Sequence, residues 1–247
     1  MTHYKTALVT GAGRGIGAET VRRFREMGME VHAVARSKDA LDALASETGC
    51  IPHAMDVTDA AAVETTFSNL PVDVLVNNAG TAGPDGPIHE ADPALLRRIL
   101  DVNVEAVATL LRAVVPGMRE RDRGHIVNIT SIAALHPLPG QIAYSASKMA
   151  LRAMTQNLRI ELFGRRVRVT EIAPARVETY FHAQQFSGDR AAAKTHLYDG
   201  YESLQARDIA DAIAYCVGAP EHVDVTLMEI LPTYQVIGGI DFHRGET

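Results

Sequence analysis

The stretch Ala7-Leu8-Val9-Thr10-Gly11-Ala12-Gly13-Arg14-Gly15-Ile16-Gly17 decides the fold, because a short apolar run meets a cluster of glycines. The apolar run predicts a strand, and the residues after the last glycine predict a helix. Gly11 can take the tight turn, Gly15 lets the backbone approach a ligand, and Gly17 lets the helix pack against the strand. Free N–H groups at such a helix start bind phosphate, so the turn predicts a dinucleotide site.

Strand-like and helix-like segments alternate along the rest of the chain. Strands are predicted over residues 6–10, 30–35, 50–56, 72–77, 124–131, 166–173 and 225–231. Helices are predicted over residues 18–27, 41–47, 60–70, 93–118 (with a possible break), 143–163 and 206–217. This alternation predicts an α/β fold with one Rossmann-type, doubly wound parallel sheet of about seven strands and helices on both faces. We expect one domain over residues 1–247, with residues 178–201, which have no clear period, as a substrate loop or lid.

Composition narrows the class of protein. Of the 247 residues, 47% are hydrophobic and 22% are charged, as in an ordinary globular protein. The net charge of −6 argues against a nucleic-acid partner, which favours a basic surface. The sequence has neither a long apolar run nor a leader-like start, so a cytoplasmic location is expected. Cys50 and Cys216 are expected to be buried thiols, and no histidine cluster predicts a metal.

The end of the second predicted strand indicates which nicotinamide cofactor is bound. Enzymes that use NAD usually carry a carboxylate there, which binds the ribose 2′-hydroxyl. Here Ala35 is followed by Arg36 and Ser37 instead. Arg36 can pair with a 2′-phosphate in a forked, charge-assisted contact, and Arg14 of the glycine turn could approach the same group. Either arginine could instead be a solvated surface charge, but together they favour NADP(H).

Tyr144 and Lys148 are candidates for proton transfer. Their spacing of four places both on one face of a predicted helix. At about 4 Å and an effective dielectric of about 20, the ammonium would stabilise the phenolate by about 4 kcal/mol. Ser131 ends the fifth predicted strand and can hydrogen-bond a substrate oxygen, and Asn103 could hold a water leading to Lys148. The spacing alone also fits an ordinary helical pair, whereas the four residues together predict a proton relay.

These motifs resemble those of the short-chain dehydrogenase/reductase family over essentially the whole chain. They stand here as Thr10-Gly11-x-x-x-Gly15-x-Gly17, Asn77-Asn78-Ala79-Gly80, Asn103, Ser131 and Tyr144-x-x-x-Lys148. The resemblance implies a catalytic tetrad of Asn103, Ser131, Tyr144 and Lys148. It implies that the cofactor contacts Gly11, Arg14, Gly15, Ile16, Gly17, Arg36, Asp56, Val57, Asn78, Ala79, Gly80, Tyr144, Lys148, Pro174, Val177 and Thr179. One departure is Ala175, where the family usually has glycine.

Segments of the later half resemble a subgroup that includes NADP-dependent 3-hydroxy acid and serine dehydrogenases, sulfoacetaldehyde reductases and clavulanate dehydrogenase. This resemblance implies a homotetramer and a small, anionic aldehyde or 3-hydroxy acid as substrate. Gln185 stands near the place of an expected carboxylate-binding arginine, so Arg176, His182 and Arg190 are alternative anion partners. Two other functions remain open: a ketoreductase for a bulkier biosynthetic carbonyl compound, and a catalytically idle NADP(H)-binding sensor.

Overall fold

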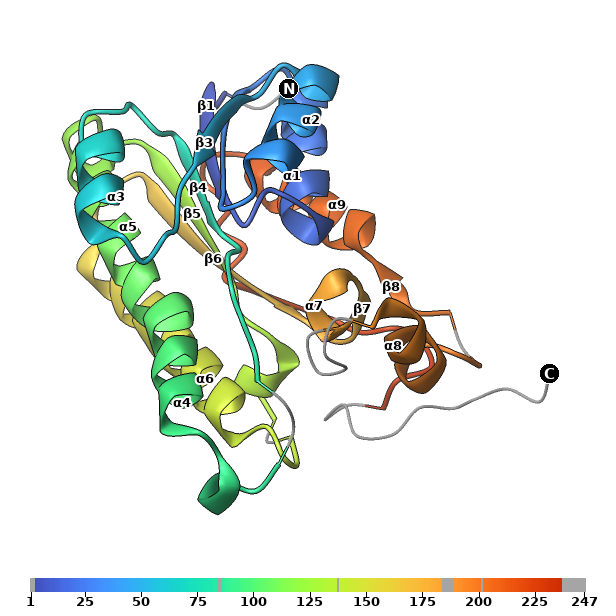
Figure 1. The fold of residues 1–247 in the computed structure, drawn as a ribbon. Helices are drawn as coiled ribbons and strands as arrows, with labels where there is room; N and C mark the ends of the chain where they lie inside the picture. Colours follow the sequence, from blue (N-terminus) through green and yellow to red (C-terminus); the bar gives the residue numbers. More distant parts are fainter. Residues whose placement is uncertain (1–2, 84–85, 137, 184–188, 201, 237–247) are drawn as a thin grey trace.

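The central feature is a seven-stranded parallel sheet with the strand order β3-β2-β1-β4-β5-β6-β9 (Figure 1). The computed structural model describes residues 3–83, 86–136, 138–183, 189–200 and 202–236. The strands are β1 (Thr6–Thr10), β2 (Glu30–Ala35), β3 (Ile51–Ala54), β4 (Val74–Asn77), β5 (Gly124–Ile129), β6 (Val167–Pro174) and β9 (Leu227–Ile230). The chain runs outward from β1 to β3 and then returns to β4, so the strand order reverses between β1 and β4. This confirms the predicted doubly wound fold.

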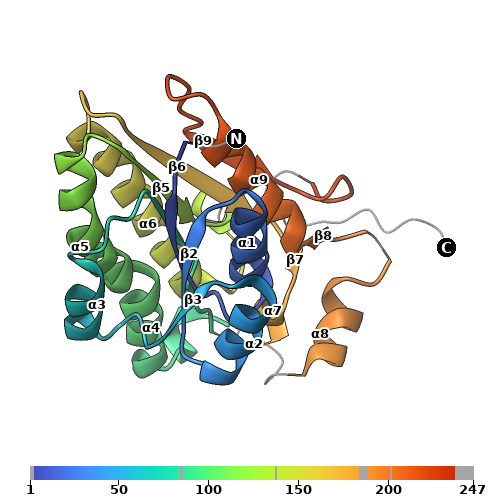
Figure 2. The same ribbon diagram turned by 90° about the horizontal axis from the view of Figure 1, so that it is seen from above.

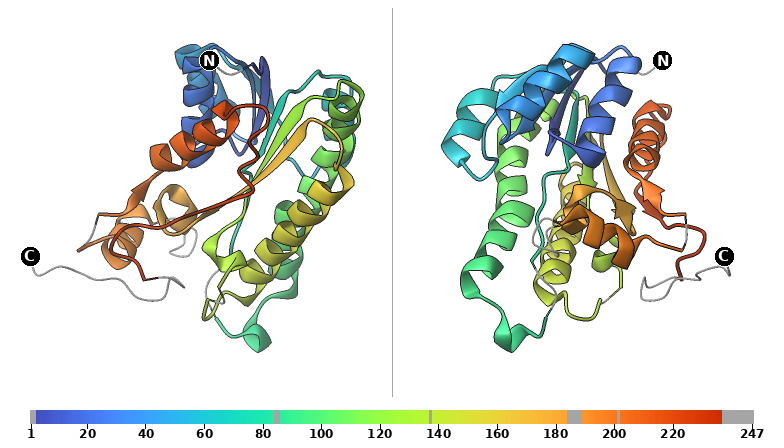
Figure 3. Two further views of the ribbon diagram at one scale, coloured as in Figure 1. Left: turned by 180° about the vertical axis from the view of Figure 1, so that it is seen from behind. Right: turned by 45° about the vertical axis from the view of Figure 1, so that its right-hand side comes forward.

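Helices cover both faces of the sheet (Figures 2 and 3). One layer holds α1 (Gly15–Glu26), α2 (Lys38–Thr48) and α9 (Ala206–Gly218). The opposite layer holds α3 (Ala60–Phe67), α4 (Pro93–Leu100), α5 (Ala106–Glu120) and α6 (Ile142–Glu161). Each layer packs its own apolar cluster against the sheet, and Leu8 and Val9 of β1 enter different clusters. Successive strand residues face opposite ways, which explains why β1 is apolar throughout.

The predicted helix over residues 93–118 is interrupted. Between α4 and α5 lies a π-helical turn, η2 (Asp101–Glu105). An apolar period of 3.6 continues almost unchanged across such a turn, so the sequence showed only a possible break. Strand β4 is shorter than predicted and begins at Val74. Asp73 precedes the strand, and its carboxylate accepts a 2.7 Å hydrogen bond from the Lys5 backbone N–H.

The predicted loop or lid contains regular structure. Its described part includes the short strand β7 (Val177–Glu178), α7 (Tyr180–Ala183) and α8 (Arg190–Leu197). Strand β7 pairs in parallel with β8 (Leu204–Gln205), which leads into α9. In Figure 3, α7 and α8 lie beyond the carboxyl end of β6, away from the two main helix layers. The described part of this segment is therefore partly helical, and its role as a substrate loop or lid stays a prediction. Residues 184–188 lie outside the described residues.

The remaining features of the fold are two short turns and two buried cysteines. Two 3₁₀ turns, η1 (Ile88–Glu90) and η3 (Ile132–Ala134), precede α4 and α6 respectively. Cys50 and Cys216 are free, buried thiols, as predicted. Among the described residues, no helix is long and apolar enough to cross a membrane.

Candidate functional site

A cleft of about 650 Å³ opens at the carboxyl ends of β1 to β6. The residues that follow these strands form its walls, as expected at the reversal point of a doubly wound sheet. Most of the predicted site residues line it: Gly11, Arg14, Gly15, Ile16, Arg36, Asp56, Val57, Asn78, Ala79, Gly80, Ser131, Tyr144, Lys148, Pro174, Val177 and Thr179. Gly17 and Asn103 are buried behind these walls. The structure therefore gathers residues from the whole length of the chain at one edge of the sheet.

The glycine turn has the geometry that its residues suggest. Gly11 and Gly15 have φ values of 66° and 57°, a backbone region that side chains disfavour. A Cβ atom on Gly17 would lie 2.3 Å from the Gly11 carbonyl oxygen. Only a glycine at position 17 therefore lets α1 start directly beside the turn, with its N–H groups facing the cleft.

Thr10 and Asn78 fasten this turn to the end of β4. The Thr10 hydroxyl accepts hydrogen bonds of 3.1 Å from the backbone N–H groups of Asn78 and Ala79. In return, the Asn78 side-chain amide donates to the Thr10 carbonyl oxygen over 2.9 Å. Sequence reasoning placed Asn78 in the cofactor channel but missed the role of Thr10. The signal was present, since Thr10 opens the glycine motif.

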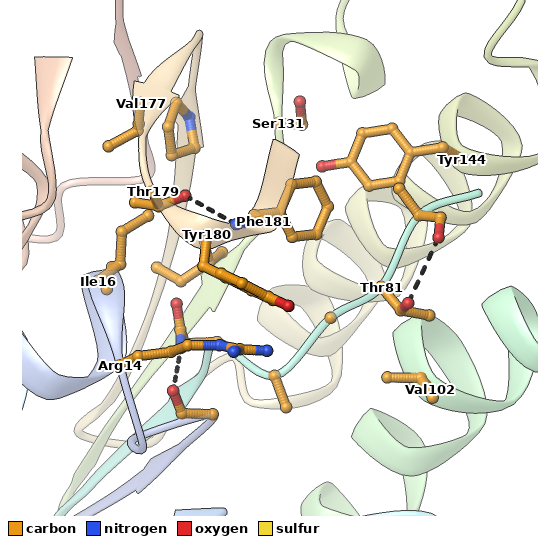
Figure 4. Close-up of a pocket in the computed structure, with 18 of the residues that line it drawn as sticks. Arg14, Ile16, Thr81, Val102, Ser131, Tyr144, Val177, Thr179, Tyr180 and Phe181 are labelled. Carbon is orange, nitrogen blue, oxygen red and sulfur yellow. Dashed lines mark hydrogen bonds between the residues drawn. The ribbon is translucent and has the colours of Figure 1, made fainter. Parts of the chain in front are cut away.

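Positive charge collects at the end of the cleft next to β2. Arg36 follows β2 and is exposed, and Arg14 extends from the glycine turn. The Arg14 guanidinium carbon lies 3.7 Å from the centre of the Tyr180 ring (Figure 4). Neither arginine is among the residues for which the structure shows an ion pair with a carboxylate. Both predicted partners of a 2′-phosphate are thus placed at the same end of the cleft.

Asp56, after β3, is held by protein partners. Burial opposes its charge, but hydrogen bonds from the Thr58 backbone and hydroxyl, and from Arg98, lower the pKa of Asp56 to about 2. The Arg98 guanidinium lies 3.0 Å from the Asp56 carboxylate. Arg98 also lines the cleft, although it was not predicted as a site residue. Arg98 lies more than forty residues from Asp56 in the sequence, so no local sequence pattern predicts this pair.

Ser131 and Tyr144 meet at the other end of the cleft, where Figure 4 shows the tyrosine hydroxyl directed toward Ser131. Ser131 lies near enough to Tyr144 to counteract part of the effect of burial on its pKa, and the Ser131 hydroxyl accepts a 3.1 Å hydrogen bond from the Ala133 backbone N–H. Burial raises the pKa of Tyr144 to about 12, and the Ser131 contact only partly offsets this effect. Two hydroxyl groups thus converge on the space where a substrate oxygen can lie.

Lys148 lies beneath Tyr144 and is buried. Its Nζ donates a 2.9 Å hydrogen bond to the Ile129 carbonyl oxygen and lies 5.8 Å from the centre of the Tyr144 ring. Burial lowers the pKa of Lys148 to about 8. We expected the ammonium to lower the pKa of Tyr144, but in the protein alone that pKa is raised. The reason is that desolvation disfavours the charged forms of both groups, and Nζ is directed to a backbone carbonyl.

Asn103 is held by hydrogen bonds to two other segments of the chain. Its side-chain oxygen accepts a 2.8 Å hydrogen bond from the Thr81 backbone N–H. Its amide nitrogen donates 2.9 Å hydrogen bonds to the Thr81 carbonyl oxygen and the Ser147 hydroxyl. The side chain therefore joins η2 to the segment after β4 and to α6, one residue before Lys148. The Asn103 amide group is thus held by protein partners, which favours a positioning role for this residue.

The substrate end of the cleft contains residues that sequence reasoning had left unassigned. Phe181 of α7 lies with its ring centre 5.7 Å from that of Tyr144. Other lining residues in this part are Leu138, Gln141, Arg176, Leu197 and Gln235. Of the suggested anion partners, Arg176 thus lines the cleft. Gln185 and the side chains of His182 and Arg190 lie outside what the structure describes. Among the described residues, no group of three or more metal-ligating side chains is present.

Ala175 shows how the chain tolerates its departure from the family pattern. Its backbone N–H donates a 2.8 Å hydrogen bond to the Ile230 carbonyl oxygen, which continues the pairing of β6 with β9. Ala175 is not among the described residues with positive φ. A glycine is therefore not needed at this position.

Comparison with known proteins places this site in a wider group. The family model described as short chain dehydrogenase matches residues 5–190. An NADP-dependent 3-hydroxy acid dehydrogenase, YdfG, of Salmonella typhi is 39% identical, covering 96% of this chain and 98% of the relative. An uncharacterized short-chain type dehydrogenase/reductase, y4eK, of Sinorhizobium fredii is 36% identical, covering 99% of this chain and 98% of its own.

Solved structures agree with these sequence relatives. The closed form of a serine dehydrogenase complexed with NADP⁺ superposes with a TM-score of 0.91 and 36% identity, covering 97% of this chain and 100% of that one. A metagenomic short-chain oxidoreductase in complex with NADP gives a TM-score of 0.78 and 31% identity, covering 93% and 97%. The resemblance inferred from the motifs therefore extends along the full length of the chain.

Proposed function

The chain belongs to the short-chain dehydrogenase family of oxidoreductases, and on that premise we propose that it uses NADP(H) to interconvert a small 3-hydroxy acid or related alcohol with its aldehyde or ketone. The observation that carries this proposal is the layout of one cleft. The hydroxyl groups of Ser131 and Tyr144 meet at one end, and two arginines lie at the other. The cleft thus offers proton chemistry and phosphate recognition together.

The cofactor choice rests on charge at the end of β2. Arg36 stands where an NAD enzyme would carry a carboxylate, and Arg14 faces the same region. A 2′-phosphate would gain charge-assisted hydrogen bonds from both guanidinium groups. The names of the 3-hydroxy acid dehydrogenase and serine dehydrogenase relatives also specify NADP. We infer that Gly11, Gly15, Ile16 and Gly17 form the turn that holds the pyrophosphate.

In the reaction, bound NADP(H) supplies or accepts the hydride at the substrate carbon. Ser131 and Tyr144 bind the substrate oxygen between their hydroxyl groups. During carbonyl reduction, Tyr144 donates its proton to that oxygen and becomes a phenolate. The protonated Lys148 beneath it stabilises this negative charge. Asn103 keeps the segment around Thr81 and α6 in register, so that both groups stay in place. In alcohol oxidation, the proton returns to Tyr144.

The remaining family contacts can be assigned in the same way. We propose that Asp56 and Val57 border the adenine, and that Asn78, Ala79 and Gly80 border the ribose. Pro174, Val177 and Thr179 would lie along the nicotinamide carboxamide. All of these residues line the cleft, which supports the assignment without testing it.

We also propose a homotetramer in which α4 to α6 form an interface. Leu100 of α4, and Ile142 and Met149 of α6, are large apolar side chains that are about half exposed. A second copy of the chain would cover them. Size-exclusion chromatography with light scattering tests this assembly, and a monomer at micromolar concentration would contradict it.

A substrate panel tests the proposed function. Turnover is measured through reduced-nicotinamide absorbance, in both directions, with serine, 3-hydroxyisobutyrate, sulfoacetaldehyde and bulky cyclic ketones as probes. We expect turnover of the small 3-hydroxy compounds, with a higher kcat/KM for NADP⁺ than for NAD⁺. A preference for NAD⁺ would refute the cofactor assignment. Turnover of the bulky ketones alone would favour the ketoreductase, and NADPH binding without any turnover would favour the sensor.

A further inference from the structure

We propose that Tyr180 is a positioning residue that orients Arg14 toward the cofactor's 2′-phosphate, so that helix α7 responds to which nicotinamide cofactor is bound. This inference rests on the proposed function and deepens it. It concerns a residue from the substrate side of the cleft that influences the opposite, phosphate-binding end. Three contacts made by the consecutive residues Thr179, Tyr180 and Phe181 support it.

The first contact is the stacking of Arg14 on Tyr180. The guanidinium carbon lies 3.7 Å from the ring centre, within the range of a cation–π interaction (Figure 4). Stacking uses the flat face of the guanidinium, whereas its N–H groups point outward in the plane. The ring of Tyr180 can therefore fix the orientation of Arg14 while the edge of the fork still faces a phosphate.

Fixing the orientation matters because Arg14 is exposed. An exposed arginine loses considerable side-chain entropy when a ligand immobilises it, and this loss weakens binding. A ring already stacked on the guanidinium removes part of that cost before the ligand arrives. The benefit applies only to a cofactor that Arg14 touches. It should thus favour NADPH over NADH, since only the 2′-phosphate distinguishes them.

The second and third contacts join this stacked pair to the catalytic end. A Cβ atom on Gly15 would lie 3.4 Å from the Thr179 methyl group, so Thr179 packs on the glycine turn. Phe181 places its ring centre 5.7 Å from that of Tyr144, and its backbone N–H donates to the Thr179 hydroxyl over 3.3 Å. Movement of α7 would therefore disturb both the Arg14 stack and the wall beside Tyr144.

Reciprocity follows from these contacts. If the present position of α7 increases the affinity for the 2′-phosphate, then binding of the 2′-phosphate must shift the conformational equilibrium of α7 toward this position by the same factor. The wall formed by Phe181 would be held more firmly with NADP(H) than with NAD(H). The KM for the carbonyl substrate should consequently be lower with NADPH than with NADH.

Two substitutions of one residue test the proposal. Tyr180→Leu removes the aromatic face but keeps an apolar side chain, and Tyr180→Phe keeps the face and removes only the hydroxyl. Dissociation constants for NADPH and NADH are measured by nicotinamide fluorescence. We expect Tyr180→Leu to weaken NADPH binding about five- to tenfold, with NADH changed less than about twofold. Tyr180→Phe should retain the wild-type ratio of the two constants.

Arg14→Ala supplies the coupling test. Combined with Tyr180→Leu, it should weaken NADPH binding no further than Arg14→Ala alone, because the stack acts only through Arg14. Phe181→Leu serves as the neighbouring control. It should alter the KM for the carbonyl substrate and leave the ratio of NADPH to NADH dissociation constants unchanged.

Each unfavourable outcome has a distinct meaning. Equal weakening of NADPH and NADH by Tyr180→Leu would overturn the inference, as would no change in either, or additive losses in the double variant. A wild-type protein without preference for NADPH would instead refute the cofactor assignment in the proposed function. A wild-type preference that Tyr180→Leu leaves unchanged in size would refute only the role of Tyr180.

Discussion

At the scale of single residues, burial shifts the two proton-handling groups in opposite directions. The pKa of Tyr144 is raised to about 12 and that of Lys148 is lowered to about 8. In both cases the neutral form is favoured, because neither charge is well solvated. At neutral pH, Tyr144 thus keeps its proton, as its proposed role as the acid in carbonyl reduction requires. Lys148 still carries its charge, although only narrowly.

The pH dependence of carbonyl reduction should report on Lys148. Its pKa is lowered to about 8, so the protonated form that we propose to stabilise the Tyr144 phenolate predominates below that pH and is lost as the pH rises. We expect kcat/KM for reduction to fall tenfold per pH unit above that value. The measurement is a pH profile at saturating NADPH. Lys148→Arg, which keeps its charge, should lose this fall in whatever activity remains, and an identical fall in both proteins would exclude Lys148 as the cause.

Removing the phenol tests the acid itself. Tyr144→Phe keeps the ring and its contact with Phe181 but has no proton to transfer. We expect turnover to fall by at least about a hundredfold, while the NADPH dissociation constant changes less than about twofold. Stopped-flow kinetics and fluorescence titration give the two quantities. Sustained turnover in this variant would mean that another group supplies the proton.

The residues that sequence reasoning found, and those it missed, differ in a physical way. Tyr144 and Lys148 share one helix face, and Gly11 and Gly17 share one turn, so their spacing carries the information. The pairs Asp56–Arg98 and Arg14–Tyr180 join segments that are distant in sequence. Such pairs depend on how helices are placed over the sheet, which no local period encodes.

At the scale of elements, the start of α1 depends on close approach of two backbones. A Cβ atom at Gly17 would meet the Gly11 carbonyl oxygen at 2.3 Å, a distance that forces the turn to move. Gly17→Ala should therefore destabilise the protein by about 1–3 kcal/mol and abolish NADPH binding. Chemical denaturation and fluorescence titration measure both effects.

Helix α9 provides the matched control. A Cβ atom on Gly218, the last residue of that helix, would meet nothing within 4 Å. Gly218→Ala should leave NADPH binding unchanged and alter the stability by less than about 1 kcal/mol. If the two alanine variants behave alike, packing at the turn is not the reason for Gly17.

The sequence predicted the existence and order of the main elements, and missed details at their ends. The seven strands follow from apolar runs of strand length, and their parallel pairing follows from the helices between them. The π-helical turn η2 and the short pair β7–β8 were not predicted. A π turn changes the hydrogen-bond partner and not the pattern of apolar residues, and a two-residue strand is too short to show a period.

At the scale of the whole molecule, histidines inside the sheet make the fold sensitive to acid. His125 of β5 is fully buried, and its ring nitrogen lies 2.8 Å from the Thr170 hydroxyl. Burial lowers the pKa of His125 well below the usual value, and burial also lowers that of His53. The unfolded chain binds protons at these sites more readily than the folded protein does. The contribution of the neutral histidines to the free energy of unfolding is thus fully present above pH about 6.5, and it is lost as the pH falls below that value.

For His125, we expect the free energy of unfolding to fall by about 1.4 kcal/mol per pH unit below pH about 6.5, until the pH reaches the lowered pKa of the folded protein. Urea denaturation at a series of pH values measures this slope. His125→Gln, which can still hydrogen-bond Thr170, should remove the contribution of His125 to this slope. A slope that does not change would assign the acid sensitivity to other groups.

The whole chain carries apolar clusters on both faces of one sheet, which share β1 through Leu8 and Val9. We propose on this basis that residues 1–247 form one domain. Neither face can lose its helices without exposing strands that the other face also packs against.

The π-helical turn between α4 and α5 has a consequence for length variation among related chains. Such a turn holds one residue more than an α-helical turn of the same rise. A chain one residue shorter here could close an ordinary α-turn and keep both flanking helices against the sheet. It would, however, lack the bulge that now carries Asn103 against Thr81. Single-residue deletions within Asp101–Glu105 should thus preserve the fold but impair the activity that depends on the position of Asn103.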